Sequence, residues 1–373
     1  MNIRTEPAHL ENGIHPLPAN AELPIRSTFL PEEKLRKLGE SLAKGELEFF
    51  HGLETFDFQE RNRENAAKIL EVYRLTNDAQ ARGETITPAA QWLLDNHYLV
   101  EETIYQIRRD LPRRFYRELP TLTVTGREVP RALALAWIYV AHVDSTVSAN
   151  MFQAIVEGYQ SVDPLRIGEL WALPSLLRFV LTENLRRLAL RVNRARELRH
   201  IANTVADAVL AAGDGDSRET ILAGYAEHAR DTTFATQLLY RLRDGSQNAG
   251  NALVWLESEL EKSGSDAEEI IIGEHRTLSS GNVTTGNIIR GLRHINDVDW
   301  TAWFEAVSQV DVLLRSRTDL GTLDFASHAR DTTFATQLLY RLRDGSRKAS
   351  DALTWLEVEL ERSGSDAEEV ILA

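Results

Sequence analysis

The short acidic pair Asp297 and Asp299 is the arrangement in this sequence that most resembles a metal-binding motif. Nucleotide-sugar transferases need acidic ligands for a divalent cation, because the cation balances the charge of the diphosphate. The pair directly precedes Trp300 and an amphipathic run. An aspartate in that position also accepts hydrogen bonds from the first amide groups of a helix. We therefore expect Asp299 to be a helix N-cap, and the sequence predicts no metal and no cofactor.

Carboxylates next to aromatic residues offer a second chemistry, that of glycosidic bonds, which needs two carboxyl groups held several ångströms apart. Glu101 and Glu102 lie near Trp92 and Tyr98, and Glu169 lies near Trp171. Acidic residues beside core aromatics are common on helices, so we expect structural roles and no catalytic residues. A carbohydrate-stacking surface remains open as a binding role, and its candidate aromatic residues are Tyr98, Tyr105, Tyr116 and Trp171.

Arg186 and Arg187 follow Glu183 and Asn184 in a segment with helical periodicity. We expect the two arginines to pair with neighbouring helices or with another domain. Other sites are excluded by residue type and spacing. The chain contains no cysteine, its ten histidines show no metal-binding spacing, and the stretch 281–291 lacks the spacing of a phosphate-binding loop. The candidate residues for carbohydrate or interdomain contact are thus Trp92, Tyr98, Tyr116, Glu169, Trp171, Arg186 and Arg187.

The composition indicates an ordinary globular protein, with 43% hydrophobic and 26% charged residues among 373. The formal net charge of -14 predicts a surface that repels nucleic acid and anionic membranes, so no nucleic-acid partner is expected. The beginning of the chain lacks the pattern of a secretory signal. The longest apolar stretches, 132–141 and 170–181, are shorter than the ~20 residues of a transmembrane helix. These features favour a cytoplasmic location without a transmembrane segment.

Helical periodicity dominates and predicts an all-α fold, with ten or more helices in an irregular bundle or a short helical array. Pro31 and Thr87-Pro88 mark helix starts, and Gly45 and Gly264 mark helix ends. Leu119 to Glu128 alternates like a strand, but we expect a loop because an isolated hairpin is marginally stable. The predicted helices lie at about 31–45, 58–82, 88–111, 132–142, 148–159, 167–198 with a kink at Pro174, 234–243, 249–261 and from 266 onward.

Residues 226–273 recur at 326–373, with 37 of 48 positions identical, which indicates a recent segmental duplication. The second copy stops where the first continues into Glu274, so we expect a truncated copy. The predicted organisation has two helical blocks with flanking segments. They are a disordered lead-in at 1–27, an N-terminal helical domain at 28–212, a second helical block at 217–326 and the duplicated segment at 327–373, which copies 227–273.

Several strings resemble the N-terminal region of the cyclic β-1,2-glucan synthases. The resemblance covers about residues 24–326 in collinear order, and its two longest strings are quite specific. The strings are PIRSTFL from Pro24, WLLDNHYLVEE from Trp92, YRELP from Tyr116, YQSVDPLRIGELWALP from Tyr159, TENLRRL from Thr182 and DFA from Asp324. After Asp324 the sequence departs from the family and returns to the repeated block.

In that family, this region precedes a membrane-embedded glycosyltransferase domain and a glycoside-phosphorylase-like domain. The resemblance implies these two domains as partners, and a place at the cytoplasmic face of the bacterial inner membrane. Neither catalytic part lies in this chain, so the resemblance transfers no catalytic residue. It favours a non-catalytic helical scaffold in glucan biosynthesis. The alternatives are a carbohydrate-binding module that holds β-glucan and, third, an autonomous enzyme related to glycosyltransferases.

Overall fold

The computed structural model describes residues 22–47, 53, 56–124, 127–212, 215–244, 250–262 and 264–308. Within this part of the chain the fold is all-α, as the sequence predicts, with thirteen α-helices, one 3-10 turn and a two-stranded hairpin. The duplicated segment 327–373 lies outside the described residues, so its expected truncation stays a prediction. Among the described residues, no helix combines the length and the apolar composition needed to span a membrane.

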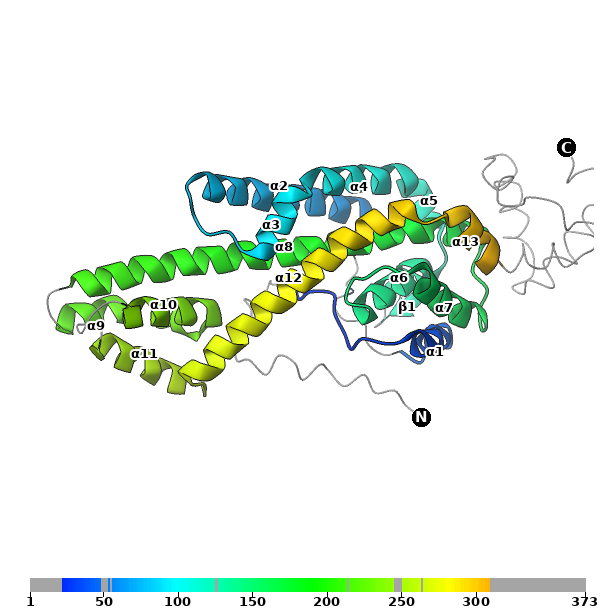
Figure 1. The fold of residues 1–373 in the computed structure, drawn as a ribbon. Helices are drawn as coiled ribbons and strands as arrows, with labels where there is room; N and C mark the ends of the chain where they lie inside the picture. Colours follow the sequence, from blue (N-terminus) through cyan, green and yellow to red (C-terminus); the bar gives the residue numbers. More distant parts are fainter. Residues whose placement is uncertain are drawn as a thin grey trace, which may run out of the picture. The chain divides into compact units, whose positions relative to one another are not determined.

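The chain packs into two compact units, and each unit combines separate stretches of sequence (Figure 1). Unit 1 contains Asn65–His97, Asn184–Gly286 and residues up to Pro24, and unit 2 contains Ile25–Glu64, Tyr98–Glu183 and residues from Asn287 onward. The boundaries fall within α2 (Phe58–Ala81), α8 (Ile167–Ala211) and α12 (Ala267–Asp297). Compact packing units need not coincide with domains that fold on their own, so the predicted domains at 28–212 and 217–326 stay predictions.

Unit 2 is built around α6 (Arg131–His142), in which every residue is buried. The run ALALAWIYVA is apolar on all sides, and such a helix is stable only when it is surrounded by protein. Helices α1 (Glu32–Ala43) and α7 (Ala149–Gln160) pack against α6 and against each other. Figure 1 shows these three helices together. The other elements that lie mainly or wholly in unit 2 are α4 (His97–Asp110), α5 (Arg113–Glu118), β1 (Thr121–Val124), β2 (Arg127–Pro130) and α13 (Trp300–Val307).

Unit 1 has its own apolar core, which buries Phe234, Leu238 and Leu256 among others. Helices α10 (Thr232–Asp244) and α11 (Gly250–Lys262) begin and end within two residues of the predicted positions. Gly264 ends α11 with a positive φ of 81°, as the sequence predicts for a C-cap glycine. Asp266 then accepts hydrogen bonds from the amides of Glu268 and Glu269 and starts α12. The remaining elements of unit 1 are α3 (Pro88–Asp95), α9 (Gly215–Ala223) and η1 (His228–Arg230).

The prediction of a loop at Leu119 to Glu128 is wrong, because β1 and β2 form an antiparallel hairpin there. The hydroxyl groups of Thr121 and Thr123 donate to the two carboxylate oxygens of Glu128, at 2.5 and 2.7 Å. These two hydrogen bonds hold the pKa of Glu128 below its usual range, and the bond from Thr121 has the larger effect. The hairpin also packs against α6 through β2. A hairpin that is marginal by itself is thus stabilised by cross-strand hydrogen bonds and by tertiary packing.

Two predicted helices also have different bounds in the structure. The helix expected from Pro88 to the residue before Pro112 is divided at Asn96 into α3 and α4. The Asn96 side-chain amide donates to the backbone carbonyl of Trp92, at 2.8 Å, which competes with continued helical bonding. The helix expected to end near Leu198 continues to Ala211, because its later residues pack into the core of unit 1.

The crossing of α1 and α7 depends on two glycines, Gly39 and Gly158. A Cβ atom at Gly158 would collide with the backbone carbonyl oxygen of Arg36, and one at Gly39 would collide with that of Ile155. The two backbones therefore lie closer than any side chain would allow. Backbone atoms cannot move aside as a flexible side chain can, so a larger residue at either position would force the helices apart.

We expect Gly158→Ala to lower the free energy of unfolding by about 1–3 kcal/mol, the usual cost of overpacking. Gly273→Ala is the matched control, because Gly273 lies within helix α12 and a Cβ there meets nothing within 4 Å. That control should stabilise the protein by up to about 1 kcal/mol through helix propensity. Urea denaturation followed by circular dichroism measures both. Equal effects of the two substitutions would contradict the close crossing.

Candidate functional site

Glu169, a candidate from the sequence, is fully buried at the start of α8 in an ion pair with Arg131. The Arg131 guanidinium donates from Nε and Nη2 to the two oxygens of Glu169, at 2.6 and 2.5 Å. Its Nη1 donates to Asp163 at 2.6 Å, and its Nη2 also donates to the carbonyl oxygen of Pro164 at 2.9 Å. The Arg131 cation lies over the ring of Tyr159, 5.8 Å from the centroid.

The electrostatics of this pair suit a permanent ion pair. Burial raises the pKa of Glu169, and its hydrogen bonds with Arg131 oppose that effect. Burial by itself lowers the pKa of Arg131, but the Glu169 carboxylate outweighs burial and the pKa of Arg131 is raised. Both carboxylate oxygens of Glu169 accept a hydrogen bond from Arg131. Oε2 also accepts a hydrogen bond from the backbone amide of Arg166, at 2.9 Å. A carboxylate bound in this way has no free oxygen with which to move a proton to or from a substrate.

Arg186 and Arg187 are both buried on α8, within unit 1. Arg186 pairs with Glu22 and donates from Nε to the Asn65 side-chain oxygen at 2.8 Å. Arg187 donates to the backbone carbonyl of Leu23 at 2.9 Å. Burial, followed by the neighbouring Arg187 charge, lowers the pKa of Arg186 to about 10, so Arg186 remains charged at neutral pH. The two arginines therefore hold the segment that precedes α1 against α8.

The lead-in segment is thus in contact with the fold over its last residues. The amide of Ser27 donates to the carbonyl of Ala141 at 2.8 Å, and Arg26 forms a salt bridge with Asp144 at 2.9 Å. The rest of the segment expected to be disordered, residues 1–21, lies outside the described residues. The pairing of Arg186 and Arg187 with this segment was not visible in the sequence, because Glu22 is separated from Arg186 by 164 positions.

The candidate aromatic residues do not gather into one groove. Tyr116 is stacked on Phe58, with 4.1 Å between ring centroids, and burial followed by the Asp57 charge raises its pKa. Trp171 is 39% exposed and packs edge-on against Phe304 at 5.7 Å. The indole ring of Trp92 packs on Gly286 within unit 1, where a Cβ would come within 3.3 Å of it. None of these three rings offers an open face comparable with those on α4.

Tyr98 and Tyr105 on α4 are the exposed members of the set, at 79% and 65%. Their spacing of seven residues places them on the same face of the helix, about 10 Å apart along its axis. Glu101 and Glu102 lie between them and are exposed. Two aromatic rings with carboxylates between them can stack on sugar rings and accept hydrogen bonds from hydroxyl groups. The structure thus brings together four of the residues that the sequence singled out.

The acidic pair near α13 has the role expected for Asp299. Its side chain accepts hydrogen bonds from the amides of Thr301 and Ala302, both at 3.0 Å, so Asp299 is the N-cap of α13. Asp297 is the last residue of α12. The described residues contain no group of three or more metal-ligating side chains. The Gly281–Gly291 stretch, which lacks phosphate-loop spacing, lies within helix α12.

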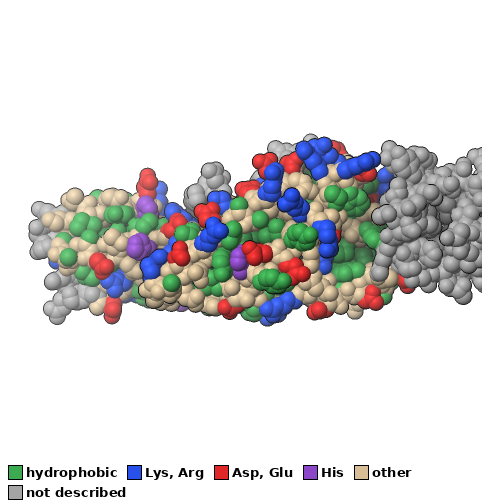
Figure 2. Space-filling view, turned by 90° about the horizontal axis from the view of Figure 1, so that it is seen from above, with side chains coloured by type: hydrophobic (Ala, Val, Ile, Leu, Met, Phe, Trp, Pro, Cys, Tyr) green, Lys and Arg blue, Asp and Glu red, His purple; other side chains and the backbone are tan. Residues whose placement is uncertain are grey.

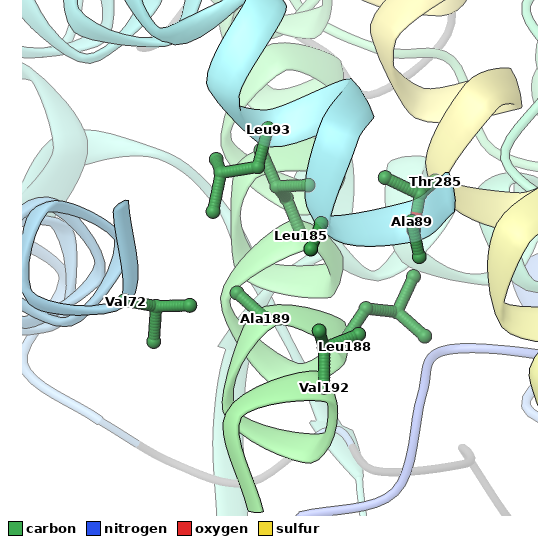
Figure 3. A pocket seen from close by; sticks show the side chains of 9 residues that line it. Val72, Ala89, Leu93, Leu185, Leu188, Ala189, Val192 and Thr285 are labelled. Atoms are coloured by element: carbon green, nitrogen blue, oxygen red, sulfur yellow. The ribbon is translucent and has the colours of Figure 1, made fainter. Parts of the chain in front are cut away.

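A small apolar pocket lies in unit 1, where side chains of α2, α3 and α8 face one another (Figure 3). Its space is about that of a single water molecule. The polar residue in its lining is Thr285, and the Thr285 hydroxyl already donates to the backbone carbonyl of Gly281 at 2.7 Å. The pocket is therefore a packing defect and no sugar site. Its lining residues are Val72, Ala89, Ala90, Leu93, Leu185, Leu188, Ala189, Val192 and Thr285.

The comparison with known proteins gives one informative relative. The chain is 52% identical over 310 residues to the cyclic β-(1,2)-glucan synthase NdvB of Rhizobium meliloti (strain 1021). This chain resembles part of a cyclic β-1,2-glucan synthase. The aligned region is 83% of this chain and 11% of the synthase, which is consistent with an N-terminal region of that protein. The resemblance seen in the sequence strings is thereby confirmed. No protein-family profile matches the chain.

Arg131, which lies at the centre of the buried network, was not among the candidate residues predicted from the sequence. The signal was present, because Arg131 stands between Pro130 and an unbroken apolar run. A charged residue at the start of a fully apolar helix needs a buried partner of opposite charge. Asn65 was also missed, and nothing in its local sequence marks it, because its partner Arg186 lies 121 positions away.

We expect Glu169→Gln to lower the free energy of unfolding by up to about 3–5 kcal/mol, since the buried Arg131 charge would then keep only the exposed carboxylate of Asp163 as a charged partner. Glu157→Gln is the matched control, because the Arg36–Glu157 pair is partly exposed and should contribute less than about 1 kcal/mol. The double variant Arg131→Met, Glu169→Leu should recover much of the loss. Urea denaturation measures all three, and a loss for Glu169→Gln no greater than for Glu157→Gln would contradict the buried pair.

Proposed function

We propose that this chain is a helical scaffold region of a cyclic β-1,2-glucan synthase and takes part in glucan biosynthesis without catalysing a reaction itself. The similarity to NdvB carries this proposal, because 52% identity extends over 310 residues and covers most of the described chain. The chain spans about a tenth of the length of that synthase. The parts that transfer sugar would therefore be supplied by the rest of such a protein.

The contacts of the candidate residues support a scaffold. Glu169 is bound by Arg131 through both oxygens, Asp299 caps a helix, and the ring of Tyr116 is stacked on Phe58. Glu169 and Asp299 thus have structural partners on their carboxylate oxygens, the atoms that a reaction would need. Arg186 and Arg187 are bound within the chain in the same way, by Glu22 and the carbonyl of Leu23. The interdomain contacts of the proposed scaffold would thus involve other, exposed residues.

The scaffold proposal is tested by adding the purified chain to a detergent-solubilised NdvB that lacks the region similar to it. We expect the chain to bind the truncated synthase in a pull-down, and Gly158→Ala, which disturbs the fold, to weaken that binding. The chain alone, incubated with nucleotide-activated glucose, should release no glucan. A lack of binding to the truncated synthase would contradict the scaffold role. Glucan made by the chain alone would contradict the non-catalytic role.

A second function, carbohydrate binding, is favoured by the exposed pair Tyr98 and Tyr105. Their rings lie on one face of α4 with Glu101 and Glu102 between them. Tyr98 is 79% exposed and Tyr105 is 65% exposed. Single exposed apolar side chains are common, but two aromatic rings on one helical face form a continuous surface of the kind that binds a ligand. The proposed ligand is a β-glucan chain, whose apolar ring faces would stack on the tyrosines.

We expect Tyr98→Ala, Tyr105→Ala to weaken the binding of a β-1,2-gluco-oligosaccharide at least about fivefold, because each stacking contact contributes about 0.5–1.5 kcal/mol. Tyr240→Ala is the control, since Tyr240 is 45% exposed on a different helix. Isothermal titration calorimetry measures affinity, and circular dichroism confirms that the variants fold. No detectable binding by the native chain, or equal losses in the two variants, would contradict carbohydrate binding at α4.

A further inference from the structure

Five exposed arginines cluster at the end of α4 and along α5, and we refer to them as the arginine patch. They are Arg108, Arg109, Arg113, Arg114 and Arg117. Residues 103–120 contain these five arginines with one aspartate and one glutamate, a formal charge of +3 within a chain of net charge -14. Figure 2 shows Lys and Arg side chains, with Asp and Glu side chains among them, on the face that is seen from above.

Neighbouring carboxylates balance this charge only in part. Arg109 pairs with Asp110 at 2.8 Å, Arg114 with Glu118 at 3.3 Å and Arg113 with Asp57 at 3.6 Å. With Asp57 included, the formal charge of the cluster is still +2. Arg108 forms no ion pair with the residues that the structure describes. Glu101 and Glu102 lie two helical turns before Arg108 and Arg109, about 10 Å away along the axis.

The exposure of the arginine side chains decides what kind of ligand they suit. The side chains of Arg109, Arg113 and Arg114 are 62%, 63% and 93% exposed. Side chains this exposed project from the surface and cannot line a cavity around a small anion. Ion pairs at such sites contribute about 0–1 kcal/mol, so the guanidinium groups can exchange their carboxylates for other anions at little cost. An extended anionic surface fits this arrangement.

We propose that the arginine patch docks the chain on a membrane surface that carries anionic lipid headgroups. The guanidinium fork forms two parallel hydrogen bonds to a phosphate oxygen pair, which suits phospholipid headgroups. Tyr105 lies one turn before Arg108 and Arg109 on the same helical face and is exposed, and tyrosine rings favour the lipid–water interface. The patch reverses the sign of charge predicted from the composition, so the membrane repulsion expected for the whole chain does not apply here.

The test is co-sedimentation of the full chain with vesicles of phosphatidylcholine containing about one third phosphatidylglycerol, and with vesicles of phosphatidylcholine alone. We expect binding to the anionic vesicles that weakens as sodium chloride rises from about 0.05 to 0.5 M. Each arginine near an anionic surface contributes about fivefold to affinity, so Arg109→Gln, Arg113→Gln, Arg114→Gln should weaken binding about a hundredfold. These exposed residues should leave the unfolding midpoint almost unchanged.

The matched control is Lys37→Gln, Lys68→Gln, Lys262→Gln, which removes the same charge from exposed ion pairs elsewhere. It should reduce vesicle binding by less than about threefold. Equal binding to both kinds of vesicle, or equal losses in the two triple variants, would overturn the proposal. Binding of the patch to polyglutamate with no binding to anionic vesicles would also overturn it, since the partner would then be an acidic polypeptide.

Discussion

The buried pair of Arg131 and Glu169 is the constraint around which unit 2 is organised. It ties the first residue of the apolar core helix α6 to the start of α8 and to the 163–164 turn between α7 and α8. Two charges removed from water stay stable only when they are paired and hydrogen-bonded completely. The pair therefore joins the start of α6 to the start of α8, and α1 and α7 pack against α6.

Polar contacts of this kind also explain why the candidate residues divide into two sets. Glu169, Arg186 and Arg187 are buried and bound by partners within the chain, so their chemistry is used for folding. Tyr98 and Tyr105 are exposed on α4, and the arginine patch follows them directly in sequence. The exposed surface of α4 and α5 therefore carries the side chains that remain available for a partner, a glucan or a lipid surface.

Much of the secondary structure could be predicted because its signals are local. Thr87 caps α3 ahead of Pro88, Asp299 caps α13, and Gly264 ends α11, as their positions before and after apolar periodic segments predict. The hairpin at 121–130 and the break at Asn96 could not be predicted with the same rules. Both depend on competition between local bonding and packing, in which the side chains of Glu128 and Asn96 decide the outcome.

The sequence by itself determined the all-α class, most helix ends and the relationship to the cyclic β-1,2-glucan synthases, because these follow from periodicity, capping residues and matching strings. Only the tertiary structure decided which candidate residues are buried and which are accessible. Arg186 meets Asn65 and Glu22 across more than a hundred residues of chain, and Tyr116 is stacked on Phe58 while Tyr98 is 79% exposed. Burial is a property of contacts between distant segments, and no local pattern encodes those contacts.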